Sequence, residues 1–98
     1  MTWLVKNPVT GEEATLTKRQ AEVLRTMRRC SDNDDGELVY EPGAGPAWLG
    51  LDHVAPRTVF ALLRLCAISP DQYGGKTEYY HINETGLGLL REIEESGE

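Results

Sequence analysis

The sequence predicts a single domain over residues 1–98, of the α+β class, in which helices surround one core and a β-hairpin precedes a C-terminal helix. Three observations carry this prediction. Two segments place apolar side chains at helical spacing, the pair Gly74-Gly75 separates two strand-like runs, and Asn83 precedes a third helical pattern. A chain of 98 residues, 40% of them hydrophobic, is the size and composition of one ordinary globular domain.

The first helix is predicted to begin after Thr17. Residues 1–15 alternate loosely and contain Asn7-Pro8, which indicates either an extended arm or a short hairpin. Thr17 and Gln20 then match a capping box, and the helix is expected to end near Cys30. Its inward side chains are Val23, Leu24, Met27 and Cys30, and its solvated side chains are Lys18, Glu22, Arg25 and Arg29.

The segment that follows is predicted to be mostly irregular. Residues 31–36 form an acidic, turn-forming loop, and residues 37–41 have the composition of a short strand. The run Gly43-Ala44-Gly45-Pro46 breaks that strand. Residues 47–51 are expected to form one or two turns of helix, although Gly50 disfavours a helix there.

A second clear helix is predicted over residues 56–66. Pro56 suits the first helical position, and Ser69-Pro70 ends the pattern. The inward side chains are Val59, Leu62, Leu63 and Cys66, and the outward side chains are Arg57, Ala61 and Arg64, with Thr58 close by.

The last part of the chain predicts a hairpin and a helix. Residues 68–72 and 77–82 read as strands on either side of Tyr73-Gly74-Gly75-Lys76. Asn83 is expected to cap the final helix, in which Leu87, Leu90 and Ile93 recur at helical spacing.

The net charge of −6 is unevenly distributed along the chain. Residues 1–30 carry a net charge of +3, and residues 53–82 carry +1. Residues 31–52 hold six acidic and no basic residues, and the last sixteen residues carry −4. An acidic protein is a poor partner for nucleic acid, but the confinement of the acids leaves the helical segments mildly basic.

Three stretches of the chain resemble the winged helix-turn-helix superfamily, of the bacterial or phage transcription-regulator type, and match no single family within it. Residues 16–24, LTKRQAEVL, resemble the opening helix of such regulators. Residues 56–68 resemble the recognition helix and its exit into the wing, and residues 80–90 are similar to the pattern that closes the wing. The resemblance covers residues 16–30 and 54–93, whereas residues 31–53 lack the second helix that this fold requires.

The resemblance implies a winged helix-turn-helix with a three-helix core, a β-hairpin wing and a C-terminal helix. It implies that the helix from residue 56 enters the major groove, with Arg57, Thr58 and Ala61 facing bases. Arg64 and Lys76 of the wing would then contact phosphates. For two arginines on a helix the commoner role is the solvated face of an amphipathic helix, and the resemblance makes the DNA role of Arg57 and Arg64 about equally well supported.

The leading functional hypothesis is a small DNA-binding transcriptional regulator whose partner is double-stranded DNA. The alternative is a winged-helix protein-interaction module, an adaptor or inhibitor of a transcription or host complex that does not bind DNA. Net acidity and the unusual segment from residue 31 to residue 53 motivate this alternative. A homodimer is a further expectation, because such regulators read paired half-sites.

Catalytic, metal and membrane functions are not predicted. Neither His53 nor His81 has a nucleophile and an orienting acid in recognisable company, so we expect no enzyme and no cofactor. Residues 31–42 lack the final glutamate of a calcium loop, and the only cysteines, Cys30 and Cys66, have no zinc-ligand spacing. Two unpaired thiols, no long apolar run and no signal peptide indicate a cytoplasmic protein without a membrane partner.

Overall fold

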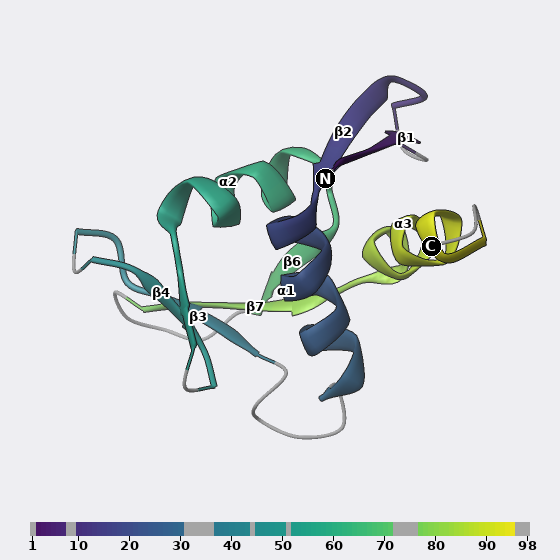
Figure 1. Ribbon diagram of the computed structural model, residues 1–98. Helices are drawn as coiled ribbons and strands as arrows, with labels where there is room; N and C mark the ends of the chain where they lie inside the picture. Colours follow the sequence, from purple (N-terminus) through teal and green to yellow (C-terminus); the bar gives the residue numbers. More distant parts are fainter. Residues whose placement is uncertain are drawn as a thin grey trace.

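The computed structural model describes residues 2–7, 10–30, 37–43, 45–50, 52–71 and 77–95. Three helices and seven strands follow one another in this part of the chain (Figure 1). They are β1 (Thr2–Lys6), β2 (Glu13–Thr17), α1 (Lys18–Arg29), β3 (Leu38–Tyr40), β4 (Ala47–Leu49), β5 (Asp52–Val54), α2 (Pro56–Arg64), β6 (Ile68–Asp71), β7 (Glu78–Ile82) and α3 (Glu84–Glu95).

The strands form two antiparallel sheets. Strands β1 and β2 pair as a hairpin that runs directly into α1, so the hairpin alternative for the first residues is confirmed. The other five strands form a sheet with the order β5-β4-β3-β7-β6. Strand β3 joins the two halves of this sheet, because Leu38 lies opposite Leu49 of β4 and opposite Tyr80 of β7.

The core lies between the helices and one face of the large sheet. Helix α1 is central and contacts α2, α3, β2 and β7; Figure 1 shows it crossing the view, with α2 to its left and α3 to its right. Leu24 and Met27 of α1 are fully buried, as are Leu38 of β3 and Leu62 of α2. Alternation along β4 buries Ala47 and Leu49 on the core side and leaves Trp48 on the opposite face, 44% exposed.

Local hydrogen bonds set the starts of two helices as the sequence predicts. The Thr17 hydroxyl accepts from the Gln20 amide at 3.1 Å, and the Gln20 side chain accepts from the Thr17 amide at 3.0 Å, which completes the capping box. The Asn83 side-chain oxygen accepts from the Gly86 amide at 2.9 Å. Asn83 also donates to the Cys66 carbonyl at 2.8 Å, so this cap anchors α3 to the end of α2.

The winged helix-turn-helix prediction is wrong. A winged helix is rich in helix and has a small wing, whereas here three further strands, β3, β4 and β5, extend the β6-β7 hairpin into a five-stranded sheet. The expected second helix is absent from the described residues between α1 and α2. The backbone explains why, since Gly43, Gly45 and Gly50 have φ angles of +84°, +105° and +62°, which no right-handed helix contains.

Two predictions about helices in the middle of the chain also need correction. The one or two turns of helix expected over residues 47–51 are wrong, because Ala47–Leu49 form strand β4, whose side chains alternate in burial and which pairs with β3 and β5. Leu51 lies outside the described residues. Helix α2 ends at Arg64, and Leu63 and Cys66 are half-buried rather than fully inward.

The C-terminal part of the chain agrees more closely with prediction. The predicted hairpin strands are confirmed as β6 and β7, but the turn at residues 73–76 lies outside the described residues. In α3, Leu90 and Ile93 are buried as predicted, whereas Leu87 is half-buried and Leu89 packs into the core.

Candidate polyanion-binding face of α1 and α2

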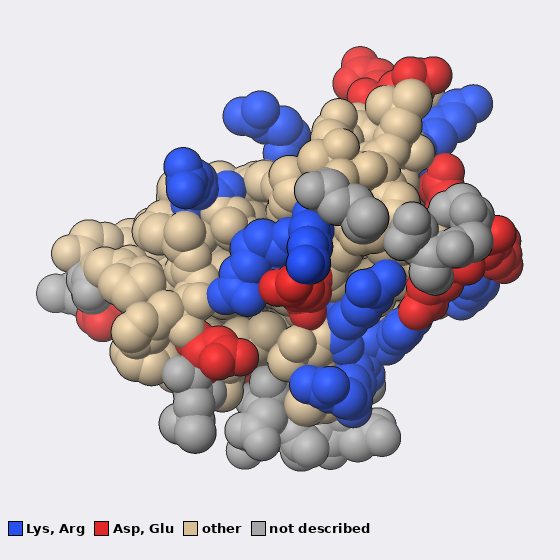
Figure 2. All heavy atoms as spheres, viewed as in Figure 1, with Lys and Arg blue, Asp and Glu red and all other residues tan. Residues whose placement is uncertain are grey.

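Helices α1 and α2 hold most of the positive charge of the protein. They contain seven of the ten basic residues and one of the sixteen acidic residues, a net charge of +6, which leaves −12 for the rest of the chain. Figure 2 shows blue side chains over the centre and upper left of one face, where α1 and α2 lie, and red side chains over α3 and the β1-β2 turn. We call the exposed side of α1 and α2 the basic face.

On α1 the basic side chains form a stripe along the solvent side. Lys18, Glu22, Arg25 and Arg29 follow one another at spacings of four, three and four residues, so they lie on one side of the helix, as the sequence predicts. Lys18 and Arg29 are exposed, whereas Arg25 is half-buried with its guanidinium 5.8 Å from the centre of the Trp3 ring. The stripe therefore presents three cations and one carboxylate to solvent.

Arg28 has a structural partner and contributes little to this face. Its guanidinium donates two hydrogen bonds to the Glu94 carboxylate of α3, at 2.7 and 2.9 Å. The hydrogen bond to Arg28 lowers the pKa of Glu94, and the same bond raises the pKa of Arg28. This pair links α1 to α3 and neutralises one positive charge at the edge of the basic face.

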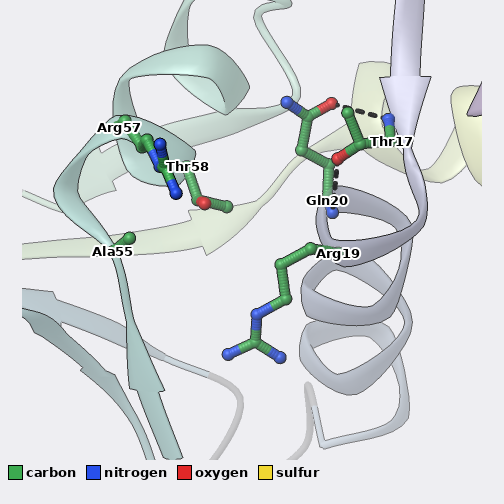
Figure 3. A pocket seen from close by; sticks show the side chains of 6 residues that line it. All are labelled: Thr17, Arg19, Gln20, Ala55, Arg57 and Thr58. Carbon is green, nitrogen blue, oxygen red and sulfur yellow. Dashed lines mark hydrogen bonds between the residues drawn. The ribbon is translucent and has the colours of Figure 1, made fainter.

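A pocket of about 410 Å³ opens where the first turns of α1 and α2 meet. Its lining residues are Thr17, Arg19, Gln20, Ala55, Arg57 and Thr58 (Figure 3). Figure 3 shows Arg57 and Thr58 projecting from α2 above the guanidinium of Arg19, which runs down and to the left from α1. Two cations from different helices thus line one hollow, which we call the arginine pocket.

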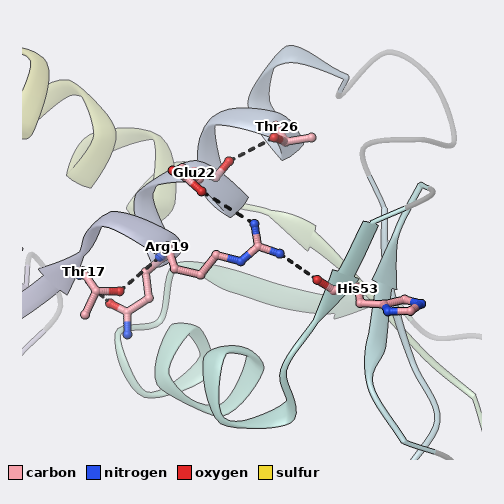
Figure 4. A network of polar contacts seen from close by, with 6 residues as sticks. Thr17, Arg19, Glu22, Thr26 and His53 are labelled. Atoms are coloured by element: carbon pink, nitrogen blue, oxygen red, sulfur yellow. Dashed lines mark hydrogen bonds and ion pairs between the residues drawn. The ribbon is translucent and has the colours of Figure 1, made fainter. Parts of the chain in front are cut away.

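Arg19 is held in place by the neighbouring strand. Its Nη2 donates to the His53 carbonyl of β5 at 2.6 Å, and its Nη1 lies 3.7 Å from the Glu22 carboxylate (Figure 4). A guanidinium carries five N–H donors in one plane, so most of its donors remain available to a ligand. Because the His53 carbonyl fixes one end of the guanidinium, less conformational entropy is lost when a ligand binds the other donors.

The structure brings together only some of the residues that the sequence selects. Arg57 and Thr58 line the arginine pocket, and Ala61 is half-buried one turn further along α2. Arg64 is exposed but lines a different pocket of about 180 Å³ beside Glu12 and Glu13. Lys76 lies outside the described residues, so nothing places it relative to the others.

Sequence reasoning misses Arg19 and the second role of Thr17. The sequence predicts Thr17 only as a helix cap and predicts no role for Arg19, because no local pattern relates α1 to α2 across 34 residues or more. The available signal is that Lys18 and Arg19 begin one helix while Arg57 begins another. Cations in the first turn oppose the helix dipole, so their presence there indicates a role other than helix stability.

Other candidate sites find no support within the described ranges. Cys30 and Cys66 are both free and half-buried, and no group of three His, Cys, Asp or Glu side chains is placed to hold a metal ion there. Residues 31–36 of the stretch compared with a calcium loop lie outside those ranges. The described helices include none that is long and apolar enough to cross a bilayer.

Comparison with known proteins identifies no relative. No family model, no curated protein and no solved structure matches the chain.

Proposed function

We propose that this protein binds double-stranded DNA through the basic face of α1 and α2, chiefly by contacts to backbone phosphates. The observation that carries the proposal is the separation of charge, +6 on two adjacent helices against −12 elsewhere. The acidic remainder repels a polyanion, so only one side of the molecule attracts DNA. The proposal keeps the predicted partner and replaces the winged-helix geometry with this helical face.

The dimensions of the face suit a duplex. Lys18 and Arg29 are separated by eleven residues of one helix, or roughly 16 Å along its axis. A duplex of that length carries about ten phosphates on its two strands, and those on the near side offer partners to the cations of the stripe in more than one register. Binding of this kind is strong in dilute salt and has little sequence selectivity.

The test compares two double variants that remove the same charge from different places. Arg29→Gln/Arg57→Gln removes two exposed cations from the basic face, and Lys6→Gln/Arg91→Gln removes two exposed cations from β1 and α3. Each variant has a formal net charge two units more negative than the parent. Fluorescence anisotropy of a labelled duplex at about 50 mM salt measures the affinity.

We expect the face variant to bind DNA at least about tenfold more weakly than the parent, because fewer phosphates are neutralised and fewer counterions are released. The control variant should stay within about threefold of the parent, because its cations lie off the face. Equal reductions in affinity for the two variants would show that DNA responds to net charge alone. Failure of the parent to bind at all would contradict the proposal outright.

A protein-interaction role is the second candidate, and the exposure of Trp48 favours it. Trp48 lies on the sheet face opposite the core and is 44% exposed. Its ring makes an edge-to-face contact with the ring of His53, with 4.0 Å between the ring centroids. Large exposed aromatics are typical anchors of protein interfaces. Crosslinking in cells at a photoreactive group placed at Trp48, compared with the same group at Leu4, tests this candidate. A defined protein adduct at position 48 alone would support it, and equal labelling at both positions would contradict it.

A further inference from the structure

The arginine pocket contains hydrogen-bond donors with few acceptors to match them. Arg19 uses one N–H on the His53 carbonyl and retains others. Arg57 is exposed and forms an ion pair with none of the described carboxylates. The Thr17 hydroxyl accepts from the Gln20 amide, which leaves its own O–H as a donor directed elsewhere. No carboxylate lines the pocket in the described part of the chain.

The nearby Glu22 carboxylate competes only weakly for Arg19. Glu22 lies 3.7 Å from Nη1 of Arg19 but does not line the pocket, and both side chains are about half exposed. An exposed pair at that distance is worth little, so it competes weakly with an anion that accepts several hydrogen bonds at once. The pocket therefore favours a small, multiply charged oxyanion.

We propose that the arginine pocket seats one phosphate group, held by Arg19 and Arg57 from two different helices and by the hydroxyls of Thr17 and Thr58. This inference rests on the proposed function in one respect: the phosphate is taken to belong to a DNA backbone. Free inorganic phosphate has the same chemistry, so the test has one arm for each source. A phosphate bound in this pocket fixes the position of the duplex on the basic face. The other cations of that face can contact phosphates in several alternative positions of the duplex.

The DNA arm uses substitutions that keep the charge. Arg57→Lys keeps one positive charge in the pocket but loses the planar pair of N–H groups that grips two phosphate oxygens. Arg91→Lys makes the same change on α3, off the basic face. We expect Arg57→Lys to weaken duplex binding about tenfold and Arg91→Lys to weaken it less than about twofold. Thermal melts of the two variants verify that both remain folded.

The second arm titrates the intact protein with inorganic phosphate alone and follows backbone and arginine side-chain N–H signals by NMR. We expect saturable shifts confined to residues of the arginine pocket, with sodium chloride at equal ionic strength as a control for salt. Thr58→Val should weaken phosphate binding several-fold while the fold is retained, because it removes a donor and keeps the side-chain shape.

The outcomes distinguish failure of the phosphate site from failure of the proposed DNA binding. Selective weakening by Arg57→Lys together with pocket-specific phosphate shifts supports the phosphate site. Equal DNA affinity in both lysine variants, or shifts spread over all of α1, overturns the phosphate site and leaves DNA binding intact. Pocket-specific shifts in a protein that binds no duplex support a site for free phosphate and overturn the DNA proposal.

Discussion

Gly86, in the first turn of α3, packs so closely against Ala67 that a larger residue cannot fit. A Cβ added at position 86 would lie 2.3 Å from the Ala67 carbonyl oxygen and 2.8 Å from Cγ1 of Ile82. Ordinary contacts begin at 3.4 Å, so α3 or the segment at Ala67 would have to move by roughly 1 Å. The same carbonyl accepts from the Asn83 amide at 3.2 Å, and that bond would be disturbed too.

The expected cost of Gly86→Ala follows from two opposing effects. Overpacking against a backbone carbonyl costs about 3 kcal/mol, the upper part of the usual range, because a carbonyl cannot rotate aside as a side chain can. Alanine is more favourable than glycine in a helix by about 1 kcal/mol. The variant should therefore lose about 2 kcal/mol of unfolding free energy, measured by urea denaturation with circular dichroism.

Gly88→Ala is the matched control, two residues along the same helix. A Cβ at position 88 meets nothing within 4 Å, so only the gain in helix propensity remains and stability should rise by up to about 1 kcal/mol. For a domain of this size the two melting temperatures should differ by more than about 10 °C. Stabilisation of the protein by both substitutions would refute the packing of α3 against Ala67.

Three further predictions concern the helix ends and one buried hydroxyl. Cys66 has a φ of +61°, so Cys66→Gly should raise the unfolding free energy by about 0.5–1 kcal/mol in urea titrations, whereas Cys66→Ala should not. The pKa of Glu94 is lowered by its bond to Arg28, so the pair stabilises the fold above the unfolded pKa of about 4.3 and loses this effect as pH falls through the folded value. The stability difference between parent and Glu94→Gln should therefore vanish in acid, and a constant difference would contradict the pairing. Burial and a hydrogen bond to Glu78 raise the pKa of Tyr80 to about 12, so Tyr80→Phe should remove a step near pH 12 from a phenolate absorbance titration, and its persistence in the variant would contradict the assignment.

The sequence could predict the parts of this fold that depend on neighbouring residues. The capping box of Thr17 and Gln20 and the cap at Asn83 act over three residues, and the structure shows both. The outward position of Arg57 follows from helical periodicity in the same way. Such features are local, so one sequence is sufficient to reveal them.

The five-stranded sheet could not be predicted in this way. The composition of residues 37–41 predicts β3, but β4 and β5 have three residues each, too few for alternation to stand out from chance. The sheet depends on pairing between strands far apart in the sequence, such as that of Leu38 with Tyr80 across 42 residues of chain. Gly43 and Gly50 adopt positive φ angles, which exclude a right-handed helix at these positions. The sequence shows that glycines stand there but does not show their φ angles.

For the same reason, only part of the candidate site can be predicted from the sequence. Helical periodicity selects Arg57 and Thr58 on the outward side of their helix, but the residue that completes the pocket, Arg19, lies 38 positions earlier. Its placement depends on the carbonyl of His53, in a strand that the sequence does not predict. A site assembled from two helices and an unpredicted strand requires the tertiary structure.

The most direct test of the central claim is the salt dependence of duplex binding. Lys18, Arg25, Arg29, Arg57 and Arg64 are the cations of α1 and α2 that are ion-paired with none of the described carboxylates. If three to five of them contact phosphates, a plot of log K against log salt concentration should have a slope of about −3 to −4.5. The Arg29→Gln/Arg57→Gln variant should have a slope shallower by about 2. A parent slope near zero, or no binding at about 50 mM salt, would contradict the account.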